Sequence, residues 1–145
     1  MARDIGINHI ALVVRDMDAS VRFYERYAGM QCVHRRTPGR DITRVAWLSD
    51  LSRPFAIVLI ESSVLRDTPL GPFGHLGVAC ESREQVDLMA EHALAEGILR
   101  RAPEDFGPPT GYWAYIADPD GNTLELSHGQ EITYTLQQVK TERSA

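Results

Sequence analysis

The sequence predicts an α+β fold in which two βαβββ modules pair into a cup-shaped sheet with the helices outside. Three observations lead to this prediction. The order of elements repeats after the middle of the chain, each repeat has one capped helix after its first strand, and the other apolar runs have strand length. We expect a first module at residues 1–61, a linker at 62–72, a second module at 73–128 and a C-terminal tail at 129–145.

The first half of the chain predicts a strand, a helix and three further strands. Asp16 or Asp18 is suited to cap the helix, and Gly29 is suited to end it. The first strand is apolar on both faces, which predicts burial on both sides. The strands are expected at residues 6–14, 30–36, 43–49 and 55–61.

The second half predicts the same order again. Ser82 and Gln85 form a capping box that begins the helix, and Gly97 ends it. The stretch Asp118–Asn122 has turn chemistry, so we expect a hairpin between the last two strands. The tail from residue 130 is polar with scattered apolar residues. The strands are expected at residues 73–80, 98–102, 111–117 and 123–127.

The composition excludes several classes of protein. A net charge of −5 and a pI near 5.5 predict no nucleic-acid partner, because phosphate contacts need an excess of Lys and Arg. Cys32 and Cys80 are too few for a disulfide framework. Residues 1–15 lack a signal-peptide pattern, and no run approaches the ~20 apolar residues of a membrane span. We therefore expect a cytoplasmic protein with no membrane partner.

Three side chains have the residue types of a metal site. His9 and His75 occupy equivalent first strands, and Glu125 lies in the middle of the last strand. A buried carboxylate needs a partner, which is a salt bridge in the ordinary case and a metal ion in the functional one. Two imidazoles and one carboxylate form the facial triad of Fe(II) oxygenases. The same set suits Mn(II), Ni(II), Co(II) or Zn(II) acting as a Lewis acid.

The residues also carry a resemblance to a known family. The matching stretches are Ile7–Leu12, Phe23-Tyr24, Gly74–Val78 and Asp118–Asn122. They resemble the vicinal oxygen chelate superfamily, which includes glyoxalase I, extradiol dioxygenases, fosfomycin-resistance transferases and bleomycin resistance proteins. The resemblance spans residues 6–128 and implies a homodimer, a small substrate that chelates through adjacent oxygens, and a metal held by His9, His75 and Glu125.

Members of this superfamily differ at a fourth ligand position on the last strand of the first module. Aligning Asp50 with Asp118 places the equivalent of Glu125 on an apolar residue. The candidates by this alignment are Ile57, Val58 and Leu59. An absent fourth ligand favours dioxygenase-like chemistry with Fe(II) or Mn(II). The alternative is a glyoxalase-type lyase or isomerase in which Glu61 is both ligand and base.

Aromatic residues give a second functional indication. Tyr115 precedes Glu125 by 10 residues, which is similar to the placement of the active-site tyrosine of extradiol dioxygenases. The catalytic base histidine of those enzymes has no evident match. Trp113 and Trp47 are candidates for the substrate pocket, although such residues also fill cores. A third hypothesis is an antibiotic-binding protein that holds an aromatic ligand against these side chains.

Overall fold

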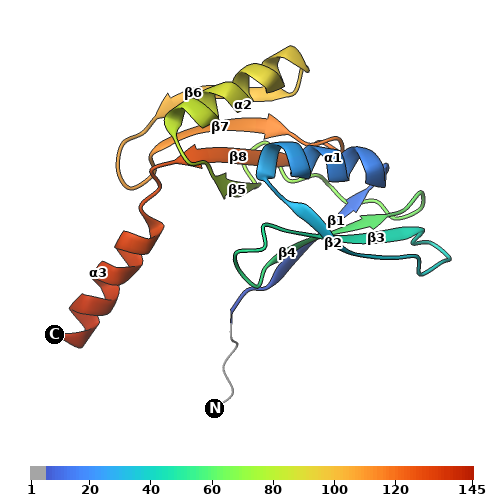
Figure 1. Ribbon diagram of the computed structural model, residues 1–145, viewed down its shortest axis with the longest axis horizontal. Helices are drawn as coiled ribbons and strands as arrows, with labels where there is room; N and C mark the ends of the chain where they lie inside the picture. The colour runs from blue at the N-terminus through green and yellow to red at the C-terminus, as the bar shows by residue number, and fades with distance from the viewer. Residues whose placement is uncertain (1–5) are drawn as a thin grey trace. The chain divides into compact units, whose positions relative to one another are not determined.

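The computed structural model describes residues 6–145 (Figure 1). It confirms an α+β fold with two βαβββ modules. The first module consists of β1 (His9–Val14), α1 (Met17–Ala28), β2 (Gln31–Arg36), β3 (Arg44–Ser49) and β4 (Ala56–Glu61). The second consists of β5 (His75–Ala79), α2 (Arg83–Ala95), β6 (Leu99–Asp105), β7 (Tyr112–Ala117) and β8 (Thr123–His128), and α3 (Ile132–Ser144) follows it.

The chain divides into two compact units. Unit 1 runs to Pro69 and also includes the turn Asp118–Gly121, whereas unit 2 comprises Leu70–Ala117 and Asn122–Ala145. The turn belongs to unit 1 because its carboxylates contact the start of that unit. The Tyr24 hydroxyl donates to Asp118 Oδ2 at 2.7 Å, and the backbone N–H of Arg15 donates to Asp120 Oδ1 at 3.1 Å.

Helix α1 forms where its caps predict. The Asp16 carboxylate accepts from the backbone N–H of Ala19 at 3.0 Å, so Asp16 rather than Asp18 is the N-cap. Gly29 ends the helix in the left-handed conformation, with φ of 60°, which favours glycine. The buried side of the helix packs on β2, β3 and β4.

The first sheet has the strand order β1-β4-β3-β2, with β1 and β4 parallel. Leu12 and Val14 are buried, whereas His9 and Ala11 on the opposite face of β1 are exposed. The expectation that this strand is buried on both faces is therefore wrong within this chain. The physical reason is that the module has a single helix, and it covers one face of a four-stranded sheet.

The second sheet repeats this arrangement with the order β5-β8-β7-β6, in which β5 and β8 are parallel. The Ser82 hydroxyl caps α2 by accepting from the backbone N–H of Gln85 at 3.1 Å. Strand β6 continues to Asp105, beyond the expected end at residue 102. It passes Pro103 because the β6–β7 pairing shifts register between Arg101 and Glu104, and an irregularity of this kind tolerates a residue without an N–H.

The C-terminal tail forms helix α3, which the sequence pattern does not predict. Its N-cap residue, Glu131, makes no side-chain capping hydrogen bond, and all its residues are exposed. Among residues 6–145, no helix has the length and apolar character needed to cross a membrane.

Candidate metal centre

The parallel pairing of β5 with β8 brings two of the predicted ligands together. Gly77 is the register partner of Glu125, and His75 is that of Thr123. The Nε2 atom of His75 lies 2.9 Å from Oε2 of Glu125. The Glu125 residue is only 6% exposed. A histidine and a buried carboxylate therefore meet on one face of the second sheet.

The other ring nitrogen of His75 fixes the chemistry of this contact. Nδ1 lies 2.6 Å from the backbone carbonyl oxygen of Phe73, which can only accept a hydrogen bond. Nδ1 therefore carries a proton, and Nε2 is the ring nitrogen that faces the Glu125 carboxylate. Two acceptors at this separation repel unless a positive charge, either a proton or a metal ion, is shared between them.

Gln130 completes the surroundings of the carboxylate. Its side-chain amide donates to Oε1 of Glu125 at 2.5 Å, so each carboxylate oxygen has its own contact. A side chain that holds the second oxygen of a ligating carboxylate fixes its orientation. Gln130 is not predicted from the sequence because it lies after the last strand, and only the three-dimensional fold brings it to Glu125.

His9 has the same pattern of contacts in unit 1. Its Nδ1 lies 2.7 Å from the side-chain oxygen of Asn8, which leaves Nε2 as the available ligand atom. His9 is in unit 1, whereas His75 and Glu125 are in unit 2, so the convergence of all three remains a prediction. Among residues 6–145, no group of three or more His, Cys, Asp and Glu side chains is arranged to hold a metal ion.

The strand registers identify the equivalent of Glu125 in the first module. His75 pairs with Thr123, and Glu125 is two residues beyond that partner. His9 pairs with Ala56, and two residues beyond that partner is Val58. Of the three apolar candidates from the sequence alignment, Val58 is therefore the structural equivalent. The first module contributes no carboxylate at this position.

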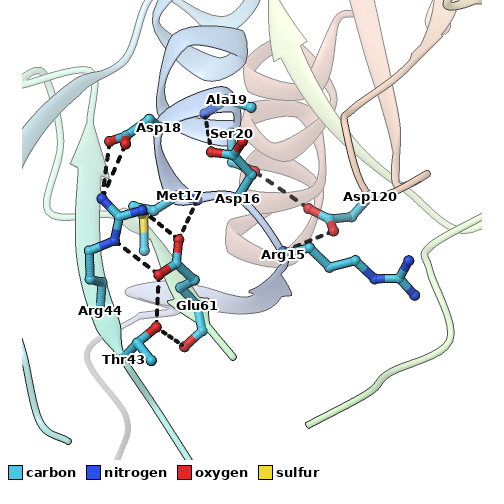
Figure 2. A network of polar contacts seen from close by, with 10 residues as sticks. All are labelled: Arg15, Asp16, Met17, Asp18, Ala19, Ser20, Thr43, Arg44, Glu61 and Asp120. Carbon is cyan, nitrogen blue, oxygen red and sulfur yellow. Dashed lines mark hydrogen bonds and ion pairs between the residues drawn. The ribbon is translucent and has the colours of Figure 1, made fainter. Parts of the chain in front are cut away.

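Glu61 is fully engaged elsewhere, as Figure 2 shows. Its Oε2 accepts from the backbone N–H of Met17 and from Arg44 Nη2, both at 2.7 Å. Its Oε1 accepts from Thr43 Oγ1 at 2.7 Å and from Arg44 Nε at 2.9 Å. Arg44 also contacts Asp18 at 3.2 Å. The hydrogen bonds from Arg44 are the largest cause that lowers the pKa of Glu61 to about 2.

The position of Glu61 on β4 agrees with these contacts. Glu61 shares the strand face of the buried Leu59, whereas Val58 shares the face of Ala11 and His9. Glu61 therefore lies on the helix-covered face and ties β4 to the first turn of α1. A ligand role for Glu61 would require the carboxylate to leave all four of these hydrogen bonds.

Aromatic side chains line the face of the second sheet beside the His75–Glu125 pair. Tyr115 is the register partner of Glu125, and its ring centroid lies 5.0 Å from that of His75 and 4.6 Å from that of Trp113. Burial raises the pKa of Tyr115, and the charge of Glu125 raises it further. The phenol therefore keeps its proton at neutral pH and is a hydrogen-bond donor.

The two tryptophans differ in exposure and belong to different units. Trp113 is 5% exposed. Trp47 is 42% exposed, pairs with Val58 in register, and lies 4.8 Å from the ring of His34. Each therefore lies on the sheet face that carries the candidate ligand of its own module.

Comparison with known proteins agrees with this architecture. A model of the Glyoxalase/Bleomycin resistance protein/Dioxygenase superfamily matches residues 6–126. The chain belongs to this superfamily. It is 37% identical to an uncharacterized protein of Pseudomonas aeruginosa over 87% of this chain and 90% of that protein. It is 28% identical to a probable lactoylglutathione lyase of Vibrio cholerae over 86% of this chain and 91% of that protein.

Solved structures of the superfamily share the fold. A possible glyoxalase from Bacillus cereus superposes with a TM-score of 0.63 at 27% identity, covering 86% of this chain and 99% of that chain. The superfamily resemblance implies a divalent metal ion, and the donor chemistry of unit 2 fits one. Adjacent ligands of an octahedral ion with bonds of about 2.1 Å lie about 3.0 Å apart. The His75–Glu125 contact of 2.9 Å is compatible with this spacing, and it is also the length of a hydrogen-bonded ion pair.

Proposed function

We propose that the protein is a metal-dependent enzyme of the vicinal oxygen chelate type, dioxygenase-like in its reaction. Its substrate is a small molecule that chelates through adjacent oxygens. The observation that supports this proposal best is the His75–Glu125 pair, in which a ring nitrogen and a buried carboxylate oxygen lie 2.9 Å apart and share a positive charge, which in this proposal is the metal ion. The absence of a carboxylate at Val58 favours a three-ligand set that leaves positions for the substrate.

In this proposal His9, His75 and Glu125 hold Fe(II) or Mn(II), with Ni(II), Co(II) or Zn(II) as other divalent ions that the same donors accept. The ion supplies Lewis acidity, which stabilises negative charge on the chelating oxygens. Asn8 and the carbonyl of Phe73 orient the two imidazoles through their Nδ1 protons. With Nδ1 engaged in this way, Nε2 is the atom of each ring that would coordinate the ion.

Tyr115 is the proposed catalytic residue beyond the ligands. Its hydroxyl is protonated at neutral pH, as that of an ordinary tyrosine is, so it donates a hydrogen bond to a substrate oxygen that is gaining negative charge. Trp113 contacts the Tyr115 ring and limits the positions that this ring can adopt. Trp47 provides a second aromatic surface for the substrate pocket on the face of the first module.

The Vibrio cholerae relative supports a second candidate, a lyase or isomerase reaction of the glyoxalase type. This alternative requires Glu61 as the fourth metal ligand and as the catalytic base. The contacts of Glu61 with Arg44, Met17 and Thr43 weigh against it, because they already occupy both carboxylate oxygens. An antibiotic-binding protein is the candidate without catalysis, and it needs no metal.

The deciding experiment measures metal content in protein purified without chelator or nickel affinity resin, and then tests two reactions. The proposal expects about one divalent ion per chain and oxygen uptake with catechols. Formation of lactoylglutathione without oxygen uptake would favour the lyase. A metal-free protein with no activity that still binds aromatic antibiotics would support the binding protein. Glu125→Ala should strongly lower metal content and activity together, whereas Glu91→Gln, an exposed change on α2, should affect neither.

A further inference from the structure

Four residues form a row across the second sheet. Arg101 is the register partner of Tyr115, Tyr115 that of Glu125, and Glu125 that of Gly77. Register partners on neighbouring strands present their side chains on the same face of a sheet. Neighbouring strands lie about 4.8 Å apart, so the Cα atoms of Arg101 and Glu125 are about 10 Å apart. Tyr115 lies between a cationic side chain and the candidate metal ligand.

The backbone of β6 is irregular on both sides of Arg101. Its pairing with β7 shifts register between Leu99 and Arg101, and again between Arg101 and Glu104. Such irregularities redirect a side chain and are common beside active sites. The guanidinium of Arg101 lies over the ring of Trp113. Its central carbon is 4.9 Å from the centroid of the Trp113 ring and 5.9 Å from the centroid of the Phe106 ring. These contacts place it on the face that carries Tyr115.

The guanidinium has unused hydrogen-bonding capacity. Its Nε donates to Glu104 at 2.7 Å, and both side chains are about half exposed, at 48% and 45%. Among the residues that the structure describes, neither Nη nitrogen has a hydrogen-bond partner. An exposed ion pair of this kind is weak, so it does not prevent a second anion from binding. The two Nη groups match the two oxygens of a carboxylate.

We propose that Arg101 binds a carboxylate of the substrate, at the end remote from the chelating oxygens, and that the substrate is a planar aromatic acid lying along Tyr115. This inference rests on the proposed function, because the chelating end is placed by His75 and Glu125. The row sets about 10 Å between the Cα atoms of Arg101 and Glu125, from which the two ends are bound. Tyr115 supplies an aromatic ring between them, with Trp113 packed against it, and Gly77 leaves the far side of Glu125 without a side chain.

The test compares two probes that differ only in the carboxylate, catechol and 3,4-dihydroxybenzoate, by calorimetric titration of the metal-loaded protein. We expect the wild type to bind the carboxylated probe about 10- to 100-fold more tightly, as for a hydrogen-bonded charge pair. Arg101→Gln should abolish this preference and leave the catechol Kd unchanged. Arg101→Lys should restore part of it. Arg66→Gln, the same charge change at an exposed connecting residue, should behave as the wild type.

The affinity of Glu104→Gln for 3,4-dihydroxybenzoate distinguishes a binding role of Arg101 from a merely structural one, because a structural role would leave this affinity unchanged. Removing the competing carboxylate should tighten binding of 3,4-dihydroxybenzoate and leave catechol binding unchanged. An undiminished preference for the carboxylated probe in Arg101→Gln would overturn the inference. So would equal affinities of the wild type for the two probes.

A metal-independent measurement separates failure of this inference from failure of the proposed function. The wild type and Arg101→Gln are titrated with benzoate in metal-free form, followed by NMR chemical shifts of the tryptophan indole N–H groups. If the protein takes up no metal but binds benzoate through Arg101, the enzyme proposal fails and the carboxylate subsite stands. If benzoate causes no shift that depends on Arg101 and the metal-loaded protein shows no carboxylate preference, the subsite fails.

Discussion

Replacing Glu61 with Gln tests whether this carboxylate stabilises the first module or binds a metal. Glutamine keeps one acceptor oxygen and places an NH2 group where the other oxygen stood. Each oxygen of Glu61 accepts two hydrogen bonds, so replacing one oxygen with NH2 disrupts up to two of the four contacts. Hydrogen bonds to charged groups contribute about 1.5–3 kcal/mol each. Because Arg44 is 39% exposed and recovers solvent contacts, we expect a total loss of about 2–3 kcal/mol.

The assay is chemical and thermal unfolding of Glu61→Gln beside the control Glu91→Gln, together with metal content and activity. For a chain of this size the loss corresponds to a Tm lower by about 5–10 °C. Metal content and activity at 25 °C should match the wild type, because Glu61 lies on the helix-covered face of β4. The control should change neither Tm nor metal content.

The stability difference should also depend on pH. The folded-state pKa of Glu61 is about 2, against an ordinary value of 4.5. A lowered folded-state pKa gives stability that is present above pH 4.5 and is lost as the pH falls toward 2. The wild type and Glu61→Gln should therefore differ fully at pH 6 and converge toward pH 2. A difference independent of pH would refute the ion-pair reasoning, and loss of metal from this variant would restore Glu61 as a ligand.

Three further predictions concern the site and the assembly. Glu125→Ala should strongly lower metal occupancy while the circular dichroism spectrum is unchanged, and unaltered stoichiometry would remove this carboxylate from the site. Gln130→Ala should weaken metal binding about 10- to 100-fold, as is usual when a partner of a ligand is lost, and an unchanged affinity in competition with a chelator dye would show that the amide has no such role. The protein should be a homodimer in light scattering at micromolar concentration, whereas a monomeric mass would contradict this prediction.

The elements that the sequence predicts well are those with local signals. The caps of α1 and α2 depend on residues within one helical turn, so the sequence predicts Ser82 and Gly29 and limits the N-cap of α1 to Asp16 or Asp18. Helix α3 lacks these signals, because Glu131 provides no side-chain cap and the apolar residues of the helix form no buried face. The extension of β6 past Pro103 depends on its register with β7, which the sequence does not reveal.

The residues of the candidate site also differ in whether the sequence reveals them. Residue types and repeat position were sufficient to select His75 and Glu125, and the parallel pairing of their strands places them in contact. The contact of Gln130 with Glu125 depends on the path of the chain after β8, for which no sequence rule exists. The partners of Glu61 lie 17 and 44 residues away, at Arg44 and Met17, so its structural role was invisible in the sequence.

The two modules of the duplication differ at one candidate ligand position. Both modules pair their first strand with their last in parallel, and both place a histidine at the same register position. The position two residues beyond its partner holds Glu125 in one module and Val58 in the other. A carboxylate at position 58 would add a fourth candidate ligand. The carboxylate of Glu61, three residues later, lies on the opposite face and accepts a hydrogen bond from the first turn of α1. Side chains alternate between the two faces of a strand, so positions 58 and 61 lie on opposite faces of β4. This alternation favours the hypothesis of a three-ligand site.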